Sequence, residues 1–221
     1  MNRHCPEVIL WDWDNTLVDA WMGVQAGMNA ALRHFDKPEW TLQEVRDRAR
    51  LSLRDSFPTI FGSQWEEARD VFYAAVRDRH LDGLMPLPGV MEALEACRHV
   101  PLCIVSNKQG AILRAEVAHL GWQSRFAAVV GAGDAEADKP SAAPILLALE
   151  AVSHQAGKRI WFVGDTGVDI RAANSAGCTS VLVGGAEHDG GVAALQPDLA
   201  FNDAHELANF LLGLAKSPPI A

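Results

Sequence analysis

Short apolar runs alternate with helical segments through most of this chain, and this alternation restricts the fold more than any other feature of the sequence. The apolar runs cover residues 8–11, 102–105, 127–130, 160–163, 180–183 and, more weakly, 199–201. Helical patterns lie between or after the later runs, at residues 90–97, 112–120, 145–152, 170–176 and 206–214. Strands that alternate with helices form βαβ units, so the pattern predicts an α/β fold with a doubly wound parallel sheet covered on both faces.

The segment between the first two apolar runs shows only helical periodicity. Its first apolar residues recur at steps of three or four, at Trp21, Val24, Met28, Leu32 and Phe35. Two further helices are expected to start at capping boxes, Thr41 with Glu44 and Ser63 with Glu66. We expect Pro58 to interrupt the stretch between these two boxes.

The change of periodicity indicates how the 221 residues are divided into domains. We expect an α/β core made of residues 1–19 and 85–221, with a helical domain of residues 20–84 inserted after the first strand. Met85 to Gly89, rich in proline and ending in glycine, marks the return to the core.

Composition excludes several classes of protein. The chain has 19 basic and 28 acidic residues, a net charge of -9, which argues against a nucleic-acid binder because phosphate contact needs a basic surface. No apolar run is long enough to span a membrane, and the N-terminus lacks the pattern of a signal peptide, so we expect a cytosolic protein. The four cysteines form no CxxC pair, and we expect reduced thiols in the core.

Polar side chains follow the apolar runs, where ligands bind in open parallel sheets. The candidates are Asp12, Asp14 and Thr16 after the first run, Ser106, Asn107 and Lys108 after the second, Lys139 after the third, and Asp165 and Asp169 after the fourth. A single acidic residue at a strand end is usually a helix cap. Several carboxylates at one edge of a sheet repel one another, and a bound cation relieves that repulsion.

Mg²⁺ suits such a site because it prefers carboxylate and water oxygens and shares the oxygens of a phosphate substrate. Lys139 and Ser106 are then suited to hold the remaining phosphate oxygens, one as a cation and the other as a hydrogen-bond donor.

The order Asp-x-Asp-x-Thr-Leu, Ser-Asn, Lys-Pro and Gly-Asp-x-x-x-Asp resembles the four motifs of the haloacid dehalogenase superfamily. A helical insertion directly after the first motif is similar to the subclass with a small α-helical cap. Within the superfamily, residues 139–144 and the Pro88-Gly89-Val90 that reopens the core look most like phosphoglycolate phosphatases and their relatives.

The resemblance implies a role for each acidic residue. Asp12 would be the nucleophile that becomes an aspartyl phosphate, and Asp14 would be the general acid and then the general base. Mg²⁺ would be bound by the Asp12 side chain, the Asp14 backbone carbonyl and Asp165, with Asp169 as a ligand or a supporting partner. Lys139 would neutralise Asp12 and the transferring group.

The resemblance also implies roles for three neutral residues. Thr16 and Ser106 would hold phosphate oxygens or order the motif, and Asn107 would help to position the nucleophile loop. Asn15 stands where glycine is common in the family.

The second carboxylate of the first motif favours a phosphatase or phosphotransferase, since dehalogenases of the superfamily lack an acid there. The expected function is therefore Mg²⁺-dependent hydrolysis of a small phosphorylated metabolite similar to 2-phosphoglycolate. A phosphomutase and a noncatalytic module that binds a phospho-ligand or a partner protein are the alternatives. The sequence leaves both a monomer and a homodimer open.

Overall fold

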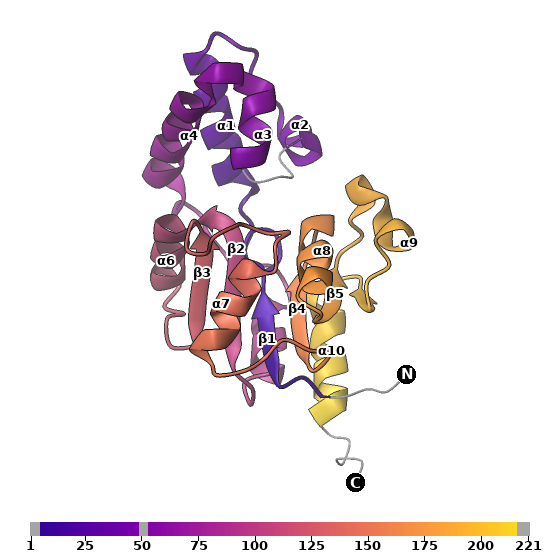
Figure 1. Cartoon of the computed structure of the whole chain (residues 1–221). Coiled ribbons are helices and arrows are strands. Elements are labelled where there is room, and N and C mark those ends of the chain that lie inside the picture. The colour runs from indigo at the N-terminus through magenta and orange to yellow at the C-terminus, as the bar shows by residue number, and fades with distance from the viewer. Residues whose placement is uncertain (1–4, 49–52, 216–221) are drawn as a thin grey trace. The chain divides into compact units, whose positions relative to one another are not determined.

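The computed structural model describes residues 5–48 and 53–215, which form two compact units. The sheet unit contains the chain up to Val18 and again from Pro86, and the helical unit contains Asp19–Met85. The boundaries expected from the sequence, 20 and 84, lie one residue inside those of the helical unit. Figure 1 shows both units and labels most of their helices and strands.

The sheet unit is built on six strands in the order β3-β2-β1-β4-β5-β6. They are β1 (Val8–Trp11), β2 (Leu102–Gln109), β3 (Ala128–Ala132), β4 (Ile160–Gly164), β5 (Thr179–Val183) and β6 (Leu199–Phe201). Every neighbouring pair is parallel. The predicted doubly wound parallel sheet is thus confirmed.

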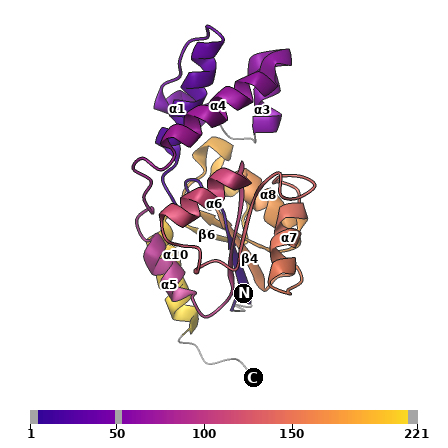
Figure 2. The ribbon, with the colours of Figure 1, turned by 90° about the vertical axis from the view of Figure 1, so that its left-hand side faces the viewer.

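Helices cover both faces of this sheet. Figure 2 shows α5 (Val90–Ala96), α6 (Gly110–His119) and α10 (Ala204–Ala215) on one side, with α7 (Ala143–Ala151) and α8 (Gly167–Ser175) on the other. The 3-10 turn η2 (Glu187–Asp189) and the short helix α9 (Gly191–Leu195) precede β6. The sequence did not predict α9, because five residues are too few to show a helical period.

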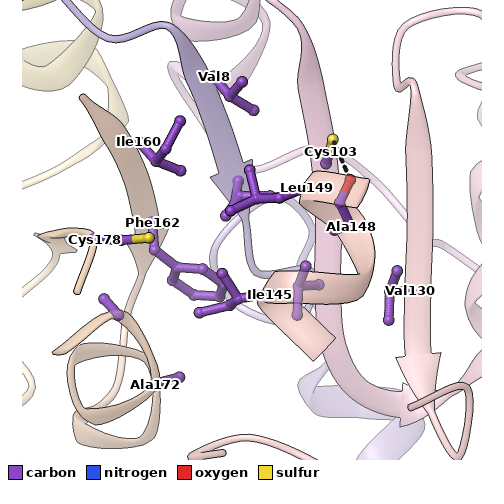
Figure 3. Close-up of a cluster of buried hydrophobic side chains, with 13 residues drawn as sticks. Val8, Cys103, Val130, Ile145, Ala148, Leu149, Ile160, Phe162, Ala172 and Cys178 are labelled. Carbon is purple, nitrogen blue, oxygen red and sulfur yellow. Dashed lines mark hydrogen bonds between the residues drawn. The ribbon is translucent and has the colours of Figure 1, made fainter. Parts of the chain in front are cut away.

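A buried cluster fills the space between the sheet and helices α7 and α8 (Figure 3). Its members alternate along the strands, for example Val8 and Leu10 of β1. On the opposite face, the ring of Trp161 from β4 lies 6.2 Å from that of Phe210 on α10. Because both faces are buried, the strands read as continuous apolar runs.

The helical unit contains α1 (Trp21–His34), α2 (Leu42–Arg48), α3 (Leu53–Phe61), the 3-10 turn η1 (Gly62–Gln64) and α4 (Trp65–Arg79). Gly27 allows α1 to approach α4 closely, since a Cβ at this position would lie 2.6 Å from Val76 Cγ2 and 2.9 Å from the Phe72 ring. The Phe72 ring also packs edge to face against Phe57, with centroids 5.7 Å apart.

The predicted capping box at the start of α2 is confirmed, because the Glu44 amide donates to Thr41 Oγ1 and the Thr41 amide donates to Glu44 Oε2. The box at Ser63 is wrong: Ser63 lies in η1, and α4 starts at Trp65 without a side-chain cap.

The expected break at Pro58 is also wrong, since this residue lies inside α3. The chain breaks instead at Gly62, which follows α3 directly and has a φ of 61°. Glycine adopts this left-handed conformation without a steric penalty and commonly ends helices.

Three of the four cysteines, Cys97, Cys103 and Cys178, are buried reduced thiols, whereas Cys5 is exposed, contrary to expectation. Cys5 precedes the buried residues of β1, and its Sγ lies 3.9 Å from the carbonyl of Leu214. Among the described helices, none combines the length and the apolar character that a membrane span requires.

Candidate active site

Two acidic residues lie at the carboxyl ends of the two central strands. Asp12 directly follows β1 and Asp165 directly follows β4, the parallel neighbour of β1. Asp169 joins them from the first turn of α8, and one carboxylate oxygen of each residue lies within 4.8 Å of the others. The chain runs outward from β1 to β3 and returns to β4, so this group lies at the switch point where open α/β sheets bind ligands.

Lys139 brings a buried positive charge to these carboxylates. Its Nζ lies 2.7 Å from Asp12 Oδ1 and 2.7 Å from Asp169 Oδ1, and its side chain is only 3% exposed. Asn107 holds the backbone of Lys139, since its Nδ2 donates to the carbonyl and its Oδ1 accepts from the amide, each at 2.9 Å. Asn107 thus supports the loop that carries Lys139 (the lysine loop), a contact that the sequence did not indicate.

Asp169 is held by the residues that start α8. Its Oδ2 accepts hydrogen bonds from the Thr166 amide at 3.0 Å and from the Thr166 hydroxyl at 2.7 Å, within a capping box. Gly164 leaves room for this carboxylate, because a Cβ there would collide with the Asp169 side chain. With Oδ1 on Lys139 and Oδ2 on Thr166, both oxygens of Asp169 have protein partners.

The motif Ser106-Asn107-Lys108 lies in an irregular part of β2. Regular pairing with β3 ends at Val105, opposite Val130, and resumes at Gln109, opposite Ala132. Three residues of β2 therefore stand opposite one residue of β3, an arrangement that redirects side chains at the end of a strand. Ser106 is 5% exposed, and its hydroxyl accepts a hydrogen bond from the Lys108 amide at 3.3 Å.

The loop after β1 is linked to the loop after β4. Thr16 Oγ1 donates a 2.8 Å hydrogen bond to Asp165 Oδ1. Asn15, between the two aspartates and Thr16, has a φ of 61°. Asparagine tolerates this left-handed conformation better than most residues, which explains how it replaces the glycine common in similar motifs.

Burial and mutual repulsion change the acidity of this cluster. Burial is the largest effect on Asp12 and raises its pKa from 3.8 to about 6, although Lys139 opposes the rise. Burial, followed by the charges of Asp169 and Asp12, also raises the pKa of Asp165 well above its usual value. Burial lowers the pKa of Lys139, but Asp12 and Asp169 outweigh it and the net pKa is raised. Lys139 is therefore a permanent cation.

A divalent cation fits this group. The donors are carboxylate oxygens only, the set that Mg²⁺ prefers, and burial together with the neighbouring negative charges disfavours the ionised forms of Asp12 and Asp165, which a bound cation would favour. Asp12 and Asp165 are the most direct ligands, because both oxygens of Asp169 already accept hydrogen bonds. The side chain of Asp14 lies elsewhere, so only its backbone could serve.

Asp14 pairs with Lys108, and Lys108 pairs with Glu116 of α6. Lys108 Nζ lies 2.6 Å from Asp14 Oδ1 and 2.7 Å from Glu116 Oε2. The sequence motifs indicated no role for Lys108 and did not include Glu116. A signal was present, because Glu116 falls on the face of α6 that also buries Ile112 and Val117, where a charged residue needs an explanation.

A family model described as haloacid dehalogenase-like hydrolase matches residues 9–183. A phosphoglycolate phosphatase of Chromobacterium violaceum is 26% identical over 222 residues, covering 96% of this chain and 99% of the relative. A phosphoglycolate phosphatase of Escherichia coli (strain K12) is 26% identical, covering 90% of each chain.

Solved structures agree in fold. A haloacid dehalogenase superfamily hydrolase from Ehrlichia chaffeensis superposes with a TM-score of 0.69 at 26% identity, covering 97% of this chain and all of the other. A haloacid dehalogenase-like family protein from Streptococcus pneumoniae gives a TM-score of 0.82 at 22% identity, covering 93% of this chain and 98% of the other.

Proposed function

The chain belongs to the haloacid dehalogenase-like hydrolase family, and we propose that it is a Mg²⁺-dependent phosphatase that hydrolyses a small phosphate monoester. The observation that carries the proposal is the position of Asp12. This carboxylate lies at the end of a central strand, 2.7 Å from a buried lysine and within 4.8 Å of two further aspartates, while a second acid follows two residues later.

Asp12 is the nucleophile of the proposed reaction. A carboxylate oxygen bonds to phosphorus, the bond between phosphorus and the leaving oxygen breaks, and that oxygen takes a proton from Asp14. A pKa of about 6 leaves most of Asp12 ionised at neutral pH, and Lys139 reduces the repulsion between this carboxylate and the anionic substrate.

Water completes the reaction. Asp14, now ionised, accepts a proton from the water that attacks phosphorus, the bond to Asp12 breaks, and inorganic phosphate leaves. A bound Mg²⁺, held by Asp12, Asp165 and the Asp14 backbone carbonyl with Asp169 as a ligand or support, would neutralise charge on the phosphoryl oxygens. Thr16 and Ser106 hold the motif loops or phosphate oxygens in this scheme, and Asn107 fixes the lysine loop.

The proposed substrate class comes from the curated relatives, which are named phosphoglycolate phosphatases. We assign the helical unit, Asp19–Met85, as a cap that contributes substrate selectivity, since it is inserted directly after the loop of Asp12 and Asp14. A small phosphorylated carboxylic acid such as 2-phosphoglycolate is the first compound to test.

The test is phosphate release from 2-phosphoglycolate and a panel of phosphorylated metabolites, with Mg²⁺ and with EDTA. We expect metal-dependent release that the Asp12→Asn variant loses. Acid quenching during turnover, followed by borohydride reduction and peptide mass spectrometry, should locate an acyl phosphate at position 12. Phosphate transfer to a second sugar phosphate without release would instead indicate a phosphomutase, and binding without any turnover would indicate a noncatalytic module.

A further inference from the structure

We infer that Glu116 is a positioning residue for the proton transfer of the proposed reaction, acting through Lys108 and Trp13 on Asp14. The inference rests on the proposed function, because that function makes Asp14 the proton donor. Glu116 belongs to α6, more than one hundred residues away in sequence from the loop that it supports.

Glu116 hydrogen-bonds to two residues next to Asp14: Trp13 precedes Asp14 in the sequence, and Lys108 forms an ion pair with it. Its Oε2 accepts a 2.5 Å hydrogen bond from the indole N–H of Trp13, the residue between Asp12 and Asp14. Both of its oxygens accept from Lys108 Nζ, at 2.9 and 2.7 Å. The same ammonium group lies 2.6 Å from Asp14 Oδ1, so Lys108 is shared between the two carboxylates.

The burial of Glu116 indicates that this arrangement serves more than packing. Its side chain is 1% exposed and that of Lys108 is 11% exposed. A buried ion pair is often no more stabilising than apolar side chains of similar size, and the neighbouring positions on α6 are filled by Ile112, Leu113 and Val117. A carboxylate at this position does what an apolar residue is unable to do, which is to hold an ammonium group and an indole N–H in fixed directions.

Through its hydrogen bond to Trp13, Glu116 also influences the orientation of the Asp14 side chain. Trp13 is fully buried, and its ring packs edge to face against Trp122 with centroids 5.8 Å apart. Fixing its N–H therefore fixes the backbone between the nucleophile and the proton donor. Lys108, placed by the irregular part of β2, then determines where the Asp14 carboxylate lies.

The test compares two substrates that differ in their need for a proton. An alkyl phosphate requires protonation of its leaving oxygen, whereas 2,4-dinitrophenyl phosphate releases a stable anion. For Glu116→Gln we expect kcat/KM for 2-phosphoglycolate, or the best alkyl phosphate of the panel, to fall about 10-fold to 100-fold. We expect kcat/KM for the dinitrophenyl ester to change by less than about threefold, because this parameter reports the step in which the leaving group departs.

Arg114→Gln is the matched control. Arg114 ties α6 to the carbonyl of Val129 in β3 and to Asp134, 2.6 Å away, and both of these partners lie outside the network of Glu116. A loss of rigidity in α6 would affect both esters equally in this variant and in Glu116→Gln. Trp13→Phe removes only the indole N–H contact among the polar links, and we expect it to show the same selective loss with a smaller amplitude.

Lys108→Met completes the design. Because Glu116 acts partly through Lys108, the double variant Glu116→Gln with Lys108→Met should lose less alkyl phosphatase activity than the product of the two single losses. Equal losses on the two esters, or independent effects in the double variant, would overturn the role of Glu116 and leave the proposed function standing. Failure of the wild-type enzyme to hydrolyse either ester with Mg²⁺ would overturn the proposed function and this role with it.

Discussion

Replacing Asp12 by asparagine should stabilise the metal-free protein above pH 6 while abolishing its activity. Burial raises the pKa of Asp12 from 3.8 to about 6. A tenfold change in a protonation constant is worth about 1.4 kcal/mol, so ionising this carboxylate in the folded state costs about 3 kcal/mol of folding free energy. This is a large share of the roughly 5–15 kcal/mol by which domains are stable.

The sign follows from proton binding. Below pH 3.8 the carboxyl group is protonated in both the folded and the unfolded chain, and it has no effect on stability. Between pH 3.8 and about 6 the unfolded chain releases the proton first, so the free energy of unfolding falls as pH rises. Asparagine is always neutral, so the Asp12→Asn variant does not lose this stability. The attraction between Lys139 and ionised Asp12 needs no separate correction, because it already lowers the Asp12 pKa to the value of about 6.

The assay is urea denaturation of both proteins in EDTA from pH 4 to pH 8, followed by tryptophan fluorescence. We expect Asp12→Asn to gain up to about 3 kcal/mol over the wild type by pH 7, with most of the gain appearing between pH 4 and pH 6. Adding Mg²⁺ should stabilise the wild type more than the variant, because ligand binding to the folded state adds to its stability. Parallel stability curves, or a variant less stable than the wild type at pH 7.5, would show that ionised Asp12 does not destabilise the folded state.

Three further predictions concern Asn107, Gly164 and the cysteines. Asn107→Ala removes both hydrogen bonds to the Lys139 backbone, and kinetics with urea denaturation should show at least about a tenfold loss of kcat and a loss of about 1–3 kcal/mol in stability. Gly164→Ala should destabilise by about 1–3 kcal/mol in denaturation experiments because its Cβ would meet Asp169, whereas Gly213→Ala, with open space at its Cβ, should not. Thiol titration of the native protein should detect one reactive cysteine, the exposed Cys5, and four after denaturation, since the remaining three are buried.

The strands and their order along the chain were predictable because both depend on local patterns. Residues 8–11 and 199–201 form strands with the expected bounds. The predicted helix boundaries that were wrong lie where a single residue determines the end of a helix. Gly62, rather than Pro58, ends α3, and a 3-10 turn replaces the expected cap at Ser63.

The second strand, β2, extends beyond its apolar run because of its backbone pairing with β3. The apolar run ends at residue 105, yet β2 continues to Gln109 because its backbone pairs again with β3 beyond the irregular motif. The polar residues within this part carry no strand-like alternation, so no local rule could have included them. Only the neighbouring strand decides that they belong to the sheet.

The order of residues along the chain shows that acidic residues, a lysine and a serine follow successive strands, and parallel strands bring their carboxyl ends to one edge. That is sufficient to assemble Asp12, Asp165 and Lys139, although Lys139 is 127 residues from Asp12. The partners of each group become visible only in the folded chain, including the bond from Asn107 to the lysine loop and the link from Asp14 through Lys108 to Glu116. Periodicity reports which face of an element is buried, but the direction of a polar side chain depends on atoms supplied by distant segments, and these meet only when the chain is folded.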